Sequence, residues 1–150
     1  MLYLAFKYIH ILAAITAVGF NASYAVWLAR GDRLSREVHE FTLRGVKLLD
    51  DRFANPAYGV LFVTGLLMVF TGPWKITTGW ILGALALFAI LILMAALGYT
   101  PALKSQIRAL ETSGRESAEY AAAARRQNLI GIAFIVPILG LIYLMVFKPF

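Results

Sequence analysis

Four stretches of the chain are continuously apolar over a length that crosses a lipid bilayer. The hydrocarbon core of a bilayer is about 30 Å thick, and a helix needs about 20 residues to cross it. Three of the four stretches carry no charged side chain, and none alternates between apolar and polar residues. Alternation is what strands of a membrane β-barrel require, so helices are predicted instead. The predicted spans are residues 2–28, 54–72, 80–99 and 129–147.

The composition supports placing these helices in lipid. Apolar residues make up 61% of the chain and charged residues 15%, against roughly 45–50% and about 25% in soluble domains. A soluble domain of this length has too small an interior to bury that much apolar surface. The sequence therefore predicts an all-α fold, a polytopic membrane four-helix bundle surrounded by membrane lipid. It forms a single integral membrane domain over residues 1–150.

The basic residues predict how the chain is oriented. Eleven of the fourteen Lys and Arg residues lie in the two long links between spans, residues 29–53 and 100–128. The positive-inside rule places these links in the cytoplasm and both termini outside it. We therefore expect a multi-pass protein of the bacterial inner (cytoplasmic) membrane. Because the basic residues are explained by topology and by anionic headgroups, no binding of nucleic acid is predicted.

The first long link is predicted to form a helical cytoplasmic extension. After a turn at Gly31 and Asp32, a helix from Ser35 places Val38 and Phe41 on an apolar face, so it lies on the membrane or rises into it. We expect His39, on this charged helix, to be solvated. The charged residues next to the second span, Asp50, Asp51 and Arg52, are expected to be solvated or in salt bridges, with binding of a headgroup or propionate as the alternative. Asn55-Pro56 predicts a kink or a fresh helix start.

The second long link is predicted to be helical as well. Leu103, Ile107 and Leu110 continue the pattern of the third span, and Thr112-Ser113-Gly114 breaks it. Ser117 is a candidate N-cap for a helix that runs into the fourth span. Within that span, Pro137 should kink the helix.

His10 is the residue of the spans that most suggests chemistry. A polar side chain in lipid is costly and normally faces other helices. Neutral imidazole is a ligand of haem iron, and helical bundles commonly hold such cofactors. Small residues near it would let another helix approach closely or leave room for a flat ligand. The residues that share its helix face are small or polar: Ala13, Ala14, Ala17, Asn21 and Tyr24.

Several uses of His10 stay open from the residues alone. It can hydrogen-bond across helices, ligate haem b, or handle a proton or another metal ion. The spans hold no second histidine. Haem iron would then be five-coordinate, or would take a methionine or the His10 of a second copy in a homodimer. The candidate methionines are Met68, Met94 and Met145. The candidate cofactor-binding residues are His10, Ala13, Ala14, Ala17 and Asn21, with His10 as the metal ligand.

Asn21 is the second polar residue of interest in the first span. A buried amide needs a partner, and both a packing contact and a ligand role are open. Its candidate partners are Tyr24, Asn55, Tyr58 and Asn128. No span contains a carboxylate, which argues against a carboxylate-based proton pump or a paired-acid hydrolase. Cysteine is absent, which excludes disulfides, thiolate metal sites and iron–sulfur clusters.

Four segments carry a resemblance to a known family. They are Lys7-Tyr-Ile-His10, the internal Asn21, the basic stretch Val46 to Arg52, and the terminal Tyr143 to Pro149. Over nearly its whole length the chain resembles a bacterial family of predicted integral membrane proteins catalogued as a domain of unknown function. More distantly, it is similar to small membrane protoporphyrinogen oxidases that bind haem b, and to copper-resistance D-type membrane domains. That similarity implies that His10 ligates haem or a metal.

Three functions follow as hypotheses. The first is a haem-b protein that uses His10 for electron transfer or porphyrin-related redox chemistry, which would make the chain a haem-linked oxidoreductase. The second is a non-catalytic accessory, scaffold or assembly subunit with a membrane protein partner. The third is a component of a small-solute transporter, which is less favoured because only Pro137 interrupts a span strongly.

Overall fold

The computed structural model describes residues 1–150, and the chain is helical apart from short turns and the last three residues. Four continuous helical stretches are long and apolar enough to cross a membrane: Leu2–Gly31, Arg36–Thr71, Gly79–Thr112 and Ala118–Phe147. The prediction of an all-α protein with four spanning helices is confirmed. The chain divides into two compact units, Met1–Ile76 and Thr77–Phe150.

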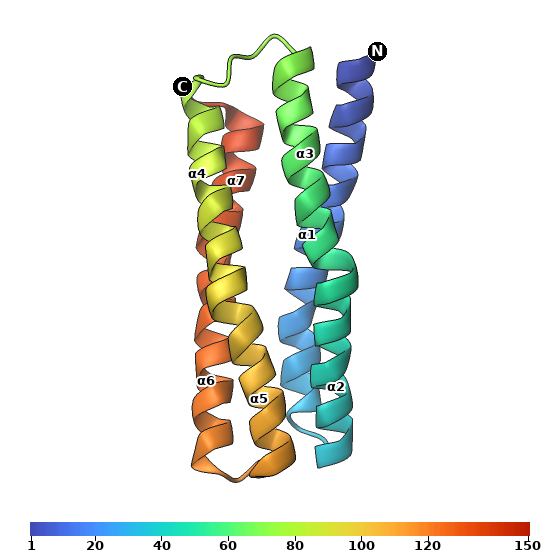
Figure 1. Cartoon of the computed structure of the whole chain (residues 1–150), viewed down its shortest axis with the longest axis vertical. Helices are drawn as coiled ribbons and strands as arrows, with labels where there is room; N and C mark the ends of the chain where they lie inside the picture. Colours follow the sequence, from blue (N-terminus) through green and yellow to red (C-terminus); the bar gives the residue numbers. More distant parts are fainter. The chain divides into compact units, whose positions relative to one another are not determined.

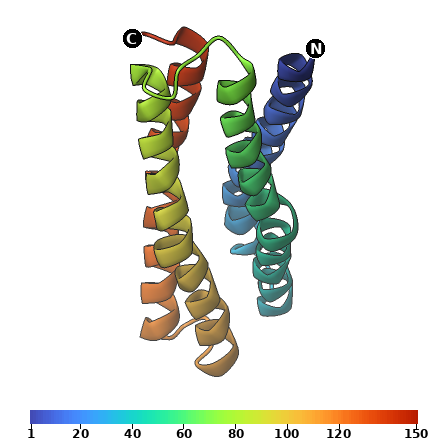
Figure 2. The ribbon, with the colours of Figure 1, turned by 45° about the horizontal axis from the view of Figure 1, so that its top comes forward.

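Unit 1 is a pair of antiparallel helical stretches. The first stretch is α1 (Leu2–Gly31), and the second joins α2 (Arg36–Leu49), the π-helical turn η1 (Asp50–Ala54) and α3 (Asn55–Thr71) without interruption. Figures 1 and 2 both show α1 running beside this second stretch.

The register of unit 1 is fixed by contacts along its length. Phe20 stacks on Phe53 with ring centroids 5.3 Å apart. At one end of the pair Tyr3 packs against Gly72, where an added Cβ would lie 2.8 Å from the ring. At the other end Gly31 packs just as closely against Thr42. Glycine at these two positions lets the helices approach closely.

The interhelical turn of unit 1 begins after Gly31, as predicted, and Ser35 starts the next helix by accepting a hydrogen bond from the Val38 N–H. The side of α2 that faces α1 carries His39, Leu43 and Val46, which are all buried. The predicted apolar face, with Val38 and Phe41, is exposed.

The expectation that His39 is solvated is wrong. Its side chain is 1% exposed, and its Nε2 lies 3.9 Å from an Asp32 carboxylate oxygen. The reason is that α2 does not lie flat on a surface. It continues directly into α3, so α1 covers the side of α2 that carries His39.

Each unit contains a widened helical turn immediately before a proline. The Asn55 N–H bonds to the Asp50 carbonyl, and the Thr100 N–H bonds to the Ala95 carbonyl, five residues back in both cases. The next residue, Pro56 or Pro101, has no N–H to give to the carbonyl four residues earlier. A π-helical turn accommodates this missing bond without ending the helix. The predicted discontinuity at Asn55-Pro56 is therefore confirmed as a local change of helix type.

Unit 2 is also a pair of antiparallel helical stretches. The first joins α4 (Gly79–Leu93), η2 (Met94–Tyr99) and α5 (Thr100–Thr112), and the second joins α6 (Ala118–Ala133) and α7 (Ile135–Phe147). The predicted break after Thr112 and the predicted N-cap at Ser117 are confirmed, because Ser117 accepts from the Tyr120 N–H. Helix α6 ends at Ala133, four residues before Pro137, so the helix is interrupted where the proline removes a backbone hydrogen bond.

The two stretches of unit 2 are packed through glycines and closed at one end by the last residues. Gly83 packs against the Leu144 side chain, and Gly140 packs against the Leu87 side chain. The chain reverses at Lys148, which adopts a left-handed conformation with φ of 47°. The Phe150 carbonyl then accepts a hydrogen bond of 3.0 Å from the Trp80 N–H at the start of α4.

Candidate functional site

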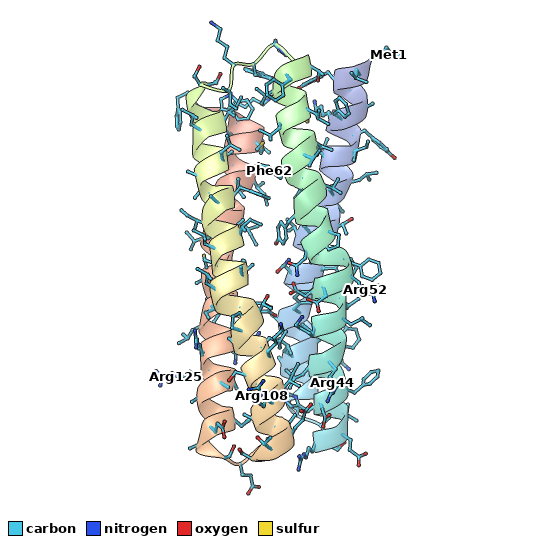
Figure 3. All side chains as sticks on the ribbon, viewed as in Figure 1. Met1, Arg44, Arg52, Phe62, Arg108 and Arg125 are labelled. Carbon is cyan, nitrogen blue, oxygen red and sulfur yellow. The ribbon has the colours of Figure 1, made fainter.

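Charge is gathered at one end of each unit. In Figure 3 the labelled arginines of unit 1, Arg44 and Arg52, lie in the half that contains the α1–α2 turn. The labelled arginines of unit 2, Arg108 and Arg125, likewise lie in the half that contains the α5–α6 turn. Four polar side chains of unit 1 bond to one another between α1 and α3, and the candidate residues are among them: His10 with Thr64, and Asn21 with Tyr58.

His10 lies against α3, where its ring interacts with Thr64, with Gly65 and with the backbone of Leu61. Its Nδ1 lies 3.0 Å from the Thr64 hydroxyl oxygen. The next residue, Gly65, faces the imidazole ring, and a Cβ added to it would lie 3.3 Å from the His10 Cε1. The ring is therefore held by a hydrogen bond to the Thr64 hydroxyl and packs against the backbone of Gly65, which has no side chain.

The hydroxyl of Thr64 determines which ring nitrogen of His10 carries the proton. Thr64 Oγ1 lies 2.6 Å from the Val60 carbonyl oxygen, to which it donates its single proton. Its oxygen can then only accept from the imidazole, so we assign the proton to Nδ1. Nε2 is left with a lone pair. A histidine that donates through one nitrogen and offers the other is the usual arrangement of a metal ligand.

The predicted cofactor-binding residues lie along one face of α1 but have different environments. Ala13 and Ala17 are buried, and Ala14 is half-buried. Asn21 donates to the Ala17 carbonyl and to the Tyr58 hydroxyl, at 2.9 Å in each case. Tyr58 was one of the predicted partners of Asn21. The structure thus brings His10 and Asn21 to the same helix interface, with separate partners on α3.

Asp50 is a buried residue that sequence reasoning missed. Its side chain is 5% exposed, and its one hydrogen bond comes from the Asn55 amide nitrogen at 3.4 Å. The expectation of a solvated or salt-bridged carboxylate is wrong for Asp50 but holds for its neighbour Asp51, which pairs with Lys47. A signal was present in the sequence, because Asp50 follows Val46 by four residues and Leu43 by seven. Helical spacing therefore places it on their buried face.

The other candidates are dispersed. Met68 lies on α3 one turn beyond Thr64, whereas Met94 and Met145 belong to unit 2. No group of three or more His, Cys, Asp or Glu side chains is placed to hold a metal ion. In unit 2 the buried polar residues are Gln106 and Gln127, and the Gln106 amide donates to the Tyr120 hydroxyl at 3.3 Å. A metal held at His10 would therefore need ligands of its own, as haem iron has.

Comparison with known proteins gives one match. The family model described as "Predicted integral membrane protein (DUF2269)" covers residues 4–149. No curated protein and no solved structure matches the chain.

Proposed function

We propose, for a chain that belongs to the DUF2269 family of predicted integral membrane proteins, that it binds haem b through His10 and takes part in electron transfer or porphyrin-related redox chemistry. The observation that carries this proposal is the hydrogen bond between His10 Nδ1 and Thr64 Oγ1. This bond orients the imidazole of His10 and, in the assigned tautomer, leaves the lone pair of Nε2 to bind iron.

The residues around His10 suit a ligand role, although not all of them would touch the macrocycle. His10 would hold the iron through Nε2, and haem would supply one-electron redox chemistry at that position. Ala13 and Ala17 are buried, and we assign them to the close approach of α1 and α3 that positions the ring. Ala14, which is half-buried, is the small side chain we place beside the cofactor. Asn21 would keep this part of α1 in register through Tyr58.

The test is an optical spectrum of the detergent-purified chain from haem-replete cells. The sequence has two histidines, so His10→Gln and His39→Gln form a matched pair of variants. We expect a Soret band in the wild type and in His39→Gln, and its loss in His10→Gln. A colourless wild type, or a His10→Gln variant with an undiminished band, would contradict haem ligation by His10.

The orientation in the membrane is part of the same proposal. We place the α1–α2 and α5–α6 turns in the cytoplasm and both termini outside, in the inner membrane of a bacterium. The support is the concentration of Lys and Arg near these two turns and the positive-inside rule. His10 would then lie in the outer half of the membrane.

One observation favours a second candidate function, a non-catalytic accessory subunit. Leu34, Val38 and Phe41 are exposed on the α1–α2 turn and on α2, which is less apolar than α3. Such a surface suits an apolar helix of a membrane protein partner. In that case a defined partner would co-purify with the wild type and with His10→Gln but not with Phe41→Glu. Retention of the partner by Phe41→Glu would argue against this use of the surface.

A further inference from the structure

The carboxylate of Asp50 is unusual because it is buried and forms no ion pair of its own, with Lys47 acting on it only from a distance. Its hydrogen bond from Asn55 is long, at 3.4 Å, and it forms no ion pair. The nearest basic residue on its own helix, Lys47, is paired with Asp51 instead. Arg52 is exposed and extends away from the helix (Figure 3).

The helix that faces Asp50 offers no positive charge either. The antiparallel register that joins Asn21 to Tyr58 and Gly31 to Thr42 places the α1 segment 21–28 opposite Asp50. That segment contains no charged residue. Lys47, Asp51 and Tyr58 interact electrostatically with Asp50, and the titratable residue of the facing α1 segment is the buried Tyr24.

A buried carboxylate in this setting calls for a positive charge from outside the protein. Removing an ionised carboxylate from water without a partner is strongly unfavourable, so the group is neutralised or binds a cation. The Asn55 amide nitrogen donates to the carboxylate, and the Tyr58 hydroxyl is close enough to interact with it electrostatically. The carboxylate oxygens are the kind of ligand that hard cations prefer.

The backbone at Asp50 is an independent sign of a specialised position. Asp50 begins the π-helical turn η1, and its carbonyl accepts the hydrogen bond that defines the turn from the Asn55 N–H. Turns of this kind inside α-helices occur frequently at functional sites. Asn55 is thus joined to Asp50 twice, once through the backbone and once through its side chain.

We propose that Asp50, with Asn55 and Tyr58, forms a binding site for a small monovalent cation, a proton or Na⁺, at the end of the apolar span nearest the α1–α2 turn. When the cation is a proton, an O–H bond forms on the Asp50 carboxylate and water supplies the proton. When it is Na⁺, the carboxylate stays ionised and is one of the ligands. This site is separate from His10 and does not depend on haem.

The experiment compares two adjacent carboxylates in the full chain, reconstituted in lipid nanodiscs. Asp50→Asn removes the buried group, and Asp51→Asn makes the same chemical change on a side chain that is 47% exposed. Infrared difference spectra are recorded across a pH titration in choline chloride. A carboxylic C=O stretch that is present in the wild type and in Asp51→Asn, and is lost in Asp50→Asn, identifies the bound proton.

A second arm distinguishes sodium. At fixed pH and ionic strength, choline is replaced by Na⁺ or by K⁺, and the unfolding temperature is measured. Na⁺ is identified as the cation when it raises the unfolding temperature of the wild type and of Asp51→Asn more than K⁺ does. Asp50→Asn should not show this increase. The proposal is overturned when neither the carboxylic stretch nor the Na⁺ effect depends on Asp50. Because both arms compare responses to a ligand, a general loss of stability in Asp50→Asn does not produce either result.

Discussion

The hydrogen bond between His10 and Thr64 lets one hydroxyl group set the tautomer and the orientation of an imidazole inside a spanning helix. Thr64 donates a hydrogen bond to the Val60 carbonyl and, in the assigned tautomer, accepts one from the His10 Nδ1–H. Outer-shell partners of this kind fix the tautomer and orientation of a histidine and raise its basicity as a ligand. Thr64 is therefore a positioning residue for the proposed haem site.

Replacement of Thr64 should weaken haem binding without abolishing it. In Thr64→Val the acceptor for Nδ1–H is lost, and we expect the haem affinity to fall about 10- to 100-fold. Thr64→Ser keeps the hydroxyl and serves as the control. Titration of haem into the apoprotein, followed at the Soret band, measures both. Equal affinities of the two variants would show that the hydroxyl does not orient the ligand.

The Asn21–Tyr58 hydrogen bond should make a modest contribution to stability. Interhelical hydrogen bonds in membrane proteins contribute on average about 0.6 kcal/mol, with a maximum near 1.7 kcal/mol. We expect Tyr58→Phe to lower the free energy of unfolding in mixed micelles by about 1 kcal/mol. Tyr8→Phe, whose side chain is 66% exposed, should have no measurable effect. A Tyr58→Phe chain as stable as the wild type would mean that Asn21 finds another partner.

Candidate site residues could be predicted from the sequence where a single polar side chain lies within an apolar span. His10 and Asn21 are conspicuous because the first span is otherwise mostly apolar, and Tyr58 was among the predicted partners of Asn21. Thr64 was missed because a threonine in a helix normally bonds to its own backbone, and only the structure shows a second partner. His39 and Asp50 were misjudged because their sequence neighbours are charged, although helical spacing places both on the buried side of α2 and η1.

At the scale of elements, the two halves of the broad apolar face of α2 have different environments. His39, Leu43 and Val46 face α1 and are buried, whereas Val38 and Phe41 remain exposed. The periodicity of α2 alone does not tell which half of this face is covered by another helix. The register of the neighbouring α1 decides which side is covered, and that register depends on contacts distant in sequence, such as Gly31 with Thr42.

Two substitutions on α2 should separate its buried side from its exposed side. Leu43 is fully buried, so Leu43→Ala should lower the free energy of unfolding by about 2–5 kcal/mol through the lost contacts and the cavity left behind. Phe41 is 78% exposed, and Phe41→Ala should change stability by about 0.5 kcal/mol or less. Chemical unfolding in detergent measures both. Comparable losses for the two variants would show that the covered side of α2 has been assigned incorrectly.

Local chemistry predicted the ends of several elements well. The caps at Ser35 and Ser117 follow from hydroxyl side chains before helical runs, and the breaks follow Gly31 and Thr112. The π-helical turns were not predicted as such. A proline after a polar residue predicts only that one backbone bond is missing, and it does not tell whether the helix bends, ends or widens.

At the scale of the whole molecule, the two units share one plan. Each is a helical pair that is apolar over most of its length and charged around the turn that joins its two stretches, and each has a π-helical turn directly before a proline. Hydrophobicity and charge alone predicted the four spans, because lipid imposes a fixed length and requires backbone groups to be bonded internally. The charge distribution also supports the proposed orientation, in which both charged turns lie on one side of the membrane.

The most direct test of this account uses the absence of cysteine from the chain. Single cysteines are introduced at three exposed positions, Arg33→Cys, Lys75→Cys and Glu116→Cys, and cells are treated with a membrane-impermeant thiol reagent that can reach the outer face of the inner membrane. We predict that Lys75→Cys is labelled in intact cells, and that Arg33→Cys and Glu116→Cys are labelled only after the inner membrane is permeabilised. Labelling of either Arg33→Cys or Glu116→Cys in intact cells would contradict a protein whose four helices cross the membrane with both charged turns in the cytoplasm.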